Sequence, residues 1–399
     1  MRSLEISESG QFFYWFALFM LIGTLLQLGN TDYMLREGSI AFKKGDLSKV
    51  KTLGLYSAFS IMFVSTIFII AFYLMGFLGI LQFSHKLLIS SPALLLLASP
   101  AFAISCNIAS LIQSGGYVAS SAFIVSGLMP AFTCVICFLF NFSDLLMFTY
   151  CVVIVMWAVA IGCFLWLLLY GGIHATASVD FWLMHKKSVP LWFSSATVQG
   201  GVWLPPILLA IMASTSEVAI FTVAARISMV FNLILASLNS VIAHRVAQAY
   251  SARNLDGTKV LVAYSLRFVW SLCIILALFI LFFSELILGV FGANLVAAEG
   301  VLAILIFGQL ISVFFGPVGL LLLMTNNRYE YLVAMLSGLF VMFTLSFLLI
   351  PLNGAFGAAI AVALSLGVQN LVANFYVKKI LGWLSYKLVF ARGLTANSP

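Results

Sequence analysis

The sequence predicts an all-α polytopic membrane protein. Hydrophobic residues make up 63% of its 399 residues and charged residues only 8%, whereas about 25% of residues are charged in a typical soluble domain. The mean hydropathy is +1.17. Apolar stretches of roughly 20 residues, enough to cross about 30 Å of hydrocarbon, recur along the whole chain. A soluble globular protein is therefore excluded.

Apolar runs and the polar segments between them define eleven predicted spans. In chain order these are 10–33, 53–81, 87–112, 117–140, 145–171, 189–212, 217–243, 261–289, 300–324, 330–350 and 354–377. The intervening segments are too short for a soluble domain. The N-terminus lacks the basic region and cleavage site of a signal peptide, so we expect the helices themselves to direct insertion.

Lysine and arginine gather in alternate loops. One side of the membrane receives fifteen of them: Arg36, Lys43, Lys44, Lys49, Lys51, Lys186, Lys187, Arg245, Arg253, Lys259, Arg328, Lys378, Lys379, Lys387 and Arg392. The other side receives Arg2 and Lys86. The positive-inside rule then places the fifteen, and the C-terminus, in the cytoplasm. The net charge of +7 accordingly indicates topology rather than nucleic-acid binding.

No pattern typical of catalysis or metal binding stands out. All six cysteines lie inside apolar runs, including both in the CVIC segment at 134–137, which favours packing over a disulfide, redox or metal role. The four histidines show no ligand spacing, and no His, Asp, Glu or Ser/Lys dyad recurs at helical spacing. We therefore expect neither an enzyme nor a bound cofactor or metal.

The chain contains a faint internal repeat. A shift of 209 residues pairs Glu8 with Glu217, Phe12 with Phe221, Asn30 with Asn239, Arg36 with Arg245, and Lys44 with Arg253. A further apolar segment, KKSVPLWFSSATVQGGVWLPPILLAIM, precedes the second copy only. Duplicated bundles are common in transporters, so we expect six helices per half. The first helix would then be missing from this sequence through a late start codon or truncated frame, which leaves eleven spans and an outside N-terminus.

The second half resembles a known family. It runs from FTVAARISMVFNLILASLNSVIAHRVAQAY through IFGQLISVFFGPVGLLLLMTNNRYEYLVAML to LIPLNGAFGAAIAVALS, and its most specific parts are FGPVG…LLMT at 315–325 and PLNGAFGAAIA at 351–361. These stretches resemble the polysaccharide-unit (O-antigen type) flippases of the multidrug/oligosaccharidyl-lipid/polysaccharide (MOP) exporter superfamily, which the first half resembles more faintly.

The resemblance implies an architecture and a function. It implies a two-bundle transporter, with bundles at 1–180 and 181–399 around a central cavity, in the bacterial inner membrane. By alternating access such a protein moves an undecaprenyl-pyrophosphate-linked oligosaccharide from the inner to the outer leaflet. The implied partners are this lipid-linked oligosaccharide, membrane lipids and glycan polymerase proteins.

Four arginines are candidate contacts for the pyrophosphate or for acidic sugars. Arg226 lies nine residues after Glu217, roughly 14 Å into the membrane, where an arginine costs at least about 2.5 to 3.5 kcal/mol unless it meets water or an anion. Its planar fork suits phosphate, although pairing with a carbonyl or carboxylate is the alternative. Arg267 can snorkel to the cytoplasm, and Arg36 and Arg245 can equally anchor the helix ends.

Uncharged polar residues inside the spans could line a wet path for sugar. Asn232 and Asn239 lie seven residues apart on one helix face, and Asn370 and Asn374 form an i, i+4 pair. The remaining candidates are Gln199 and Gln309. Each of these residues could instead hold helices together.

Two further roles have candidates. Gly200, Gly201, Pro205 and Pro206 in GGVWLPP would loosen a helix, either as a hinge in alternating access or as a static kink. Asp32 is the candidate for ion coupling, because it lies within the first span at ion-pair spacing from Arg36.

Other functions remain open at this stage. An ion-coupled multidrug exporter of the same superfamily would favour an acidic residue deep in a helix. A lipid II flippase would show more cationic residues along its cavity, and a non-transporting membrane scaffold for glycan enzymes would have little reason to keep an intramembrane arginine.

Overall fold

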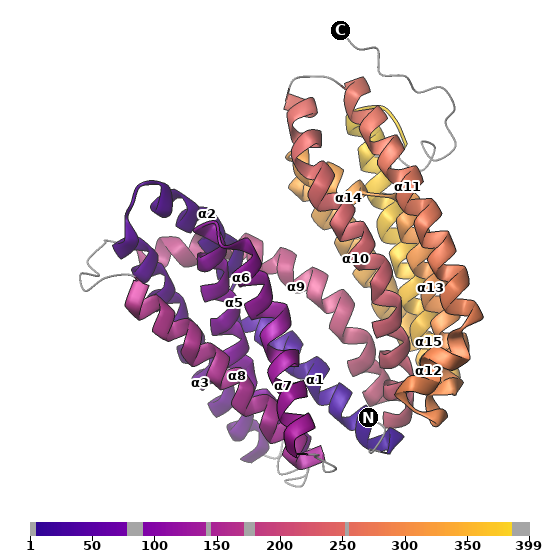
Figure 1. Cartoon of the computed structure of the whole chain (residues 1–399), viewed down its shortest axis with the longest axis horizontal. Coiled ribbons are helices and arrows are strands. Elements are labelled where there is room, and N and C mark those ends of the chain that lie inside the picture. Colours follow the sequence, from indigo (N-terminus) through magenta and orange to yellow (C-terminus); the bar gives the residue numbers. More distant parts are fainter. Residues whose placement is uncertain (1–4, 78–90, 141–144, 171–179, 252–254, 385–399) are drawn as a thin grey trace. The chain divides into compact units, whose positions relative to one another are not determined.

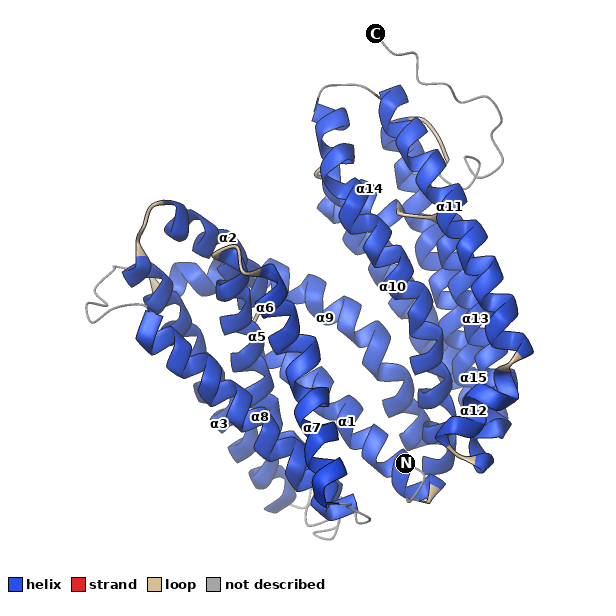
Figure 2. Cartoon of the chain, viewed as in Figure 1, coloured by secondary structure: helices blue, strands red, loops and turns tan. Residues whose placement is uncertain are grey.

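A computed structural model describes residues 5–77, 91–140, 145–170, 180–251 and 255–384 (Figure 1). Every regular element in these ranges is a helix and none is a strand (Figure 2), which confirms the all-α prediction. The chain divides into two compact units. We call Tyr14–Trp203 the N-terminal unit, and Met1–Phe13 with Leu204–Pro399 the C-terminal unit. The predicted ranges 1–180 and 181–399 divide the chain before α9 instead of within it.

The helices follow one another with short connections. Up to α9 they are α1 (Ile6–Leu26), α2 (Asn30–Lys43), α3 (Leu47–Phe77), η1 (Ser91–Ala98), α5 (Ser99–Ser114), α6 (Val118–Ala122), η2 (Phe123–Leu128), α7 (Met129–Phe140), α8 (Leu145–Tyr170) and α9 (Phe181–Met212). Beyond α9 they are α10 (Thr215–Ser251), α11 (Leu255–Phe282), α12 (Ser284–Phe291), η3 (Ala293–Ala298), α13 (Glu299–Phe315), α14 (Val318–Met324) and α15 (Arg328–Leu381).

The described residues contain nine helices long and apolar enough to cross a membrane, or ten if the bent pair Val118–Leu128 and Pro130–Ile136 is one span. α15 counts there as one helix, although Gly354 divides it into two arms of more than 20 residues each. Gly354 has φ 51° and ψ −127°, a conformation that only glycine adopts without strain. Each of the eleven predicted spans overlaps a described helix.

Three predicted spans are wrong in detail. The span 10–33 is not one helix, because Leu28 (φ 54°) and Gly29 (φ 69°) turn the chain between α1 and α2. The span 300–324 is interrupted at Gly316 and Pro317, where proline lacks the N–H that would continue α13. The span 261–289 ends at Phe282, and the short α12 begins two residues later.

The two helices paired by the internal repeat therefore differ. α10 runs unbroken through Asn239, whereas the corresponding stretch of the first copy is divided just before Asn30. The break at Gly29 has a packing cause, because the backbone of Ser188 and Trp192 in α9 leaves no room for a Cβ there. Only glycine satisfies both the left-handed conformation and this close approach.

Each unit has its own apolar core. In the N-terminal unit it includes Met34, Leu53, Ile108 and Leu167, from α2, α3, α5 and α8. In the C-terminal unit a larger core joins α9, α10, α11, α13 and α15. A polar tie closes one end of it, where the backbone N–H of Ala355 donates to Oε2 of Glu217 at 2.8 Å. This carboxylate therefore caps the second arm of α15 from α10.

Candidate functional site

One exposed face of α10 is polar in the middle of a span. Arg226, Asn232 and Ser237 are exposed on this helix, within or close to the candidate span Thr215–Asn239. We call these three residues the α10 strip. The exposed face of α11 is different, since Phe268, Ile275 and Phe282 are 71%, 66% and 82% exposed.

The contrast between α10 and α11 separates two kinds of surface. Large apolar side chains that stay exposed on a membrane helix are suited to lipid. A mid-span arginine is costly in hydrocarbon, and such residues face water-filled or protein-lined spaces. The α10 strip is therefore the best candidate in the C-terminal unit for a surface that meets a polar ligand.

Arg226 has donors to offer such a ligand. Its Nη1 atom lies 3.6 Å from the thioether sulfur of Met229, one turn further along α10. A thioether is a weak acceptor, and a guanidinium carries five N–H donors in a fixed fork. The arrangement can present a bidentate pair of donors to a phosphate or carboxylate.

The other predicted residues of α10 are placed differently. Asn239 is half-buried, and its Oδ1 atom is buried without a hydrogen bond from the described residues. Asn232, seven residues earlier, is exposed. Arg245 belongs to α10, but its side chain lies outside what the structure describes. Arg267 on α11 is half-buried and stacks over the Tyr264 ring at 5.8 Å.

Three predicted sugar contacts are buried between α13 and α15. Gln309, Asn370 and Asn374 are all buried. Asn370 donates from Nδ2 to Oγ of Ser312 at 3.2 Å and to the Leu366 carbonyl at 2.8 Å. Oε1 of Gln309 has no hydrogen bond among the described residues. This placement favours the alternative that these amides hold two helices together.

The candidates near α2 lie on an exposed surface. Asp32 and Arg36 are both exposed, and the neighbouring Glu37 forms an ion pair with Lys49 at 3.1 Å that ties α2 to α3. Burial raises the pKa of the Tyr33 phenol, as do the charges of Glu37 and Asp180, while Arg36 lowers it. Asp32 is thus a surface acid of α2 rather than a buried one.

The joint between α1 and α2 is built from polar residues that the sequence did not single out together. Trp192 donates its indole N–H to the Leu25 carbonyl at 2.8 Å, and Ser188 donates to Oδ1 of Asn30 at 3.0 Å. Both donors come from α9, so α9 supports the broken helix. The available signal was the Gly29-Asn30 dipeptide inside an apolar run, since glycine and asparagine commonly end helices.

Asn107 on α5 completes this joint. Its Nδ2 atom donates to Oγ of Ser57 at 2.6 Å and lies 3.4 Å from the Gln27 carbonyl. Thr31 donates to Oδ1 of Asn107 at 3.0 Å. Four helices of the N-terminal unit therefore meet in one hydrogen-bonded cluster at the break.

The predicted hinge residues lie where α9 passes from one unit to the other. The boundary falls between Trp203 and Leu204, inside the GGVWLPP segment, and α9 stays helical through it. An added Cβ on Gly201 would meet nothing within 4 Å. Pro205 and Pro206 remove two backbone donors from this helix. Gln199 is half-buried, one turn before the boundary.

The comparisons with known proteins agree with this architecture. Residues 190–348 match the MatE family model. A solved multidrug resistance MATE family transporter of the MOP superfamily, in its inward-facing conformation, superposes with a TM-score of 0.69. The alignment covers 97% of this chain and 92% of that one at 14% identity. The chain has the MATE fold. No curated protein sequence matches it.

Two further structures show the same fold. A MOP superfamily transporter from Pyrococcus furiosus gives a TM-score of 0.67 at 15% identity, covering 94% of this chain and 88% of that one. An outward-facing MATE family transporter gives 0.63 at 14% identity, covering 94% and 87%. The stretch that matches the MatE family model runs from α9 to the first arm of α15, so it contains the hinge residues and Arg226.

Proposed function

We propose that this chain is a MOP-type transporter that works by alternating access and flips a pyrophosphate-linked, lipid-anchored oligosaccharide across the bacterial inner membrane. The observation that carries the proposal is the exposed arginine in the middle of the α10 span. Its cost in hydrocarbon is offset when it meets an anion in a polar cavity. Asn232 and Ser237 beside it supply the uncharged hydrogen-bonding groups that sugar hydroxyls need.

Two comparisons support the coarser part of this proposal. Solved proteins of this fold are described in inward-facing and outward-facing conformations, which supports alternating access. The Pyrococcus furiosus protein is described as having a binding pocket of reverse polarity that suggests a different function. Pocket polarity thus distinguishes members of one fold, and a cationic strip suits an anionic substrate.

The flippase reading is tested in a bacterium that lacks its own oligosaccharide flippase, with surface glycan as the readout. We expect this chain to restore the glycan. Arg226→Ala should lower restoration about tenfold or more, since a charge-assisted hydrogen bond is worth about 1.5–3 kcal/mol. Arg226→Lys should retain much of it, and Arg267→Ala, the matched change on α11, should retain nearly all. Unchanged restoration in Arg226→Ala would end the role given to this residue.

A multidrug exporter is the second candidate, because the MatE family model matches residues 190–348. The same cells decide between the two functions when they are challenged with cationic drugs. Increased drug resistance without restored glycan would replace the flippase proposal with the exporter. Restored glycan without resistance would support the flippase.

A further inference from the structure

Two apolar grooves flank α8 in the N-terminal unit. The first lies between α3 and α8, has a volume of about 870 Å³, and is lined by Leu55, Tyr56, Ala58, Phe59, Met62, Ile104, Trp157, Ala160, Ile161, Phe164, Leu165 and Phe181. We call it the α3–α8 groove. α8 is apolar on all sides and only 33% of its best spanning window is buried, so both grooves open within a surface suited to lipid.

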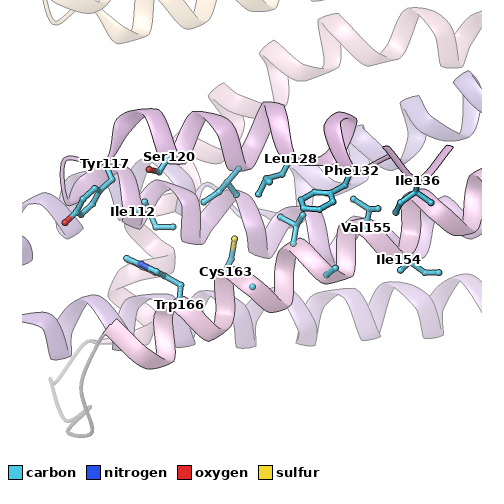
Figure 3. Close-up of a pocket in the computed structure, with 14 residues that line it drawn as sticks. Ile112, Tyr117, Ser120, Leu128, Phe132, Ile136, Ile154, Val155, Cys163 and Trp166 are labelled. Atoms are coloured by element: carbon cyan, nitrogen blue, oxygen red, sulfur yellow. The ribbon is translucent and has the colours of Figure 1, made fainter. Parts of the chain in front are cut away.

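The second groove lies on the other side of α8 and has a volume of about 640 Å³. Figure 3 shows Tyr117 and Trp166 at one end of it, and Ile136 and Ile154 towards the other. We call it the α7–α8 groove. Tyrosine and tryptophan at one end are typical of a membrane–water interface. None of its fourteen described lining residues is charged.

A lysine distinguishes the α3–α8 groove from its neighbour. Lys51 is half-buried, and its Nζ atom lies 3.5 Å from the Leu168 carbonyl, so it bridges α3 and α8. It precedes the lining residue Leu55 by one helical turn on α3, and Leu168 follows the lining residue Leu165 by one turn on α8. The ammonium therefore sits at the mouth of the groove.

The length of the groove corresponds to one leaflet. From Lys51 to Met62 is eleven residues of helix, roughly 16 Å. Half of a hydrocarbon core of about 30 Å is about 15 Å. A chain that starts at the level of Lys51 and follows the groove would therefore end near the bilayer midplane.

The charges around the mouth fit an anionic headgroup. An ammonium has three N–H donors, and the Leu168 carbonyl can accept only one of them from Lys51. Lys43 and Lys44 are exposed on the same short connection between α2 and α3. Asp180, next to the lining residue Phe181, is engaged as an acceptor from the backbone N–H of Leu183.

We infer that the α3–α8 groove binds an anionic phospholipid, with its phosphate at Lys51 and one acyl chain along the groove. Basic residues between membrane helices at the lipid surface recognise such headgroups. The α7–α8 groove, which has the same helix as one wall and no charged lining residue, takes lipid without regard to headgroup charge. This inference does not depend on what the protein transports.

Each groove contains one reporter tryptophan, Trp157 in the first and Trp166 in the second. The purified protein is placed in phosphatidylcholine vesicles with a minority of phosphatidylglycerol, and either lipid carries brominated chains that quench indole fluorescence on contact. The Trp157 contribution is the difference between the wild type and Trp157→Phe, and Trp166→Phe isolates the other. We expect phosphatidylglycerol to be enriched about fivefold at Trp157 over random mixing, and not at Trp166.

Lys51→Ala should reduce the enrichment at Trp157 to that of random mixing, while Lys51→Arg should keep it. Lys44→Ala removes the same charge from the same connection outside the groove, and should also keep it. Circular dichroism and gel filtration check that each variant is folded, and Lys51→Arg keeps the test decisive if Lys51→Ala is not. The inference is overturned by equal quenching from both lipids at Trp157, or by equal losses in Lys44→Ala and Lys51→Ala. It is also overturned if unbrominated polyprenyl phosphate displaces phosphatidylglycerol from Trp157 more strongly than phosphatidylglycerol itself does.

Discussion

Gly29 and Gly45 have nearly the same backbone conformation in very different surroundings. Their φ angles are +69° and +70°. An added Cβ at Gly45 meets nothing within 4 Å, whereas at Gly29 it would meet the backbone of α9 at Ser188 and Trp192. A left-handed conformation alone costs a non-glycine residue roughly 1–2 kcal/mol. The two positions therefore separate the cost of conformation from the cost of lost space.

We predict that Gly29→Ala destabilises the protein more than Gly45→Ala. The latter should cost about 1–2 kcal/mol in free energy of unfolding, and the former a further 1–3 kcal/mol or so because the backbone must move to accommodate a methyl group. Thermal unfolding of the two variants in the same detergent measures the difference. Equal losses would mean that α9 does not hold the α1–α2 joint in the way described above.

At the scale of the element, the sequence predicts which segments are helices better than where they break. All eleven predicted spans overlap described helices because length and apolarity alone identify them. The breaks at Gly29 and Gly316 depend on what lies opposite them, which a single sequence does not reveal. The same applies to Asn370, whose spacing from Asn374 indicates a shared face, while its burial against Ser312 on α13 emerges only from the fold.

The helix-pairing role of Asn370 and the exposed position of Asn232 lead to opposite predictions. Asn370→Ala should lower the free energy of unfolding by about 1–3 kcal/mol, because it removes the bond to Ser312 from a buried site. Transport per folded molecule should change little. Asn232→Ala should leave stability within about 0.5 kcal/mol and lower transport. Thermal unfolding and glycan restoration, normalised to the amount of protein in the membrane, test both variants, and the reverse pattern would return Asn370 to the substrate path.

At the scale of the whole molecule, α9 is covalently continuous across the boundary between the two units. The boundary at Trp203 and Leu204 falls between the paired glycines and the paired prolines of GGVWLPP. Proline removes a backbone hydrogen bond and crowds the preceding turn, so this part of the helix resists bending least. Alternating access requires the units of a transporter to move against each other. The position of the segment thus favours a hinge over a static kink.

We predict that Pro205→Ala combined with Pro206→Ala stabilises the protein and slows transport. Alanine restores the missing backbone donors and is the best helix former, so the melting temperature should rise while glycan restoration falls several-fold. Pro351→Ala is the matched control, because Pro351 also lies inside a helix, the first arm of α15, but within a single unit. It should stiffen α15 without slowing transport. If both changes slowed transport equally, helix stiffness in general would limit the cycle; if neither did, α9 would be a static connection and the motion would have to arise elsewhere.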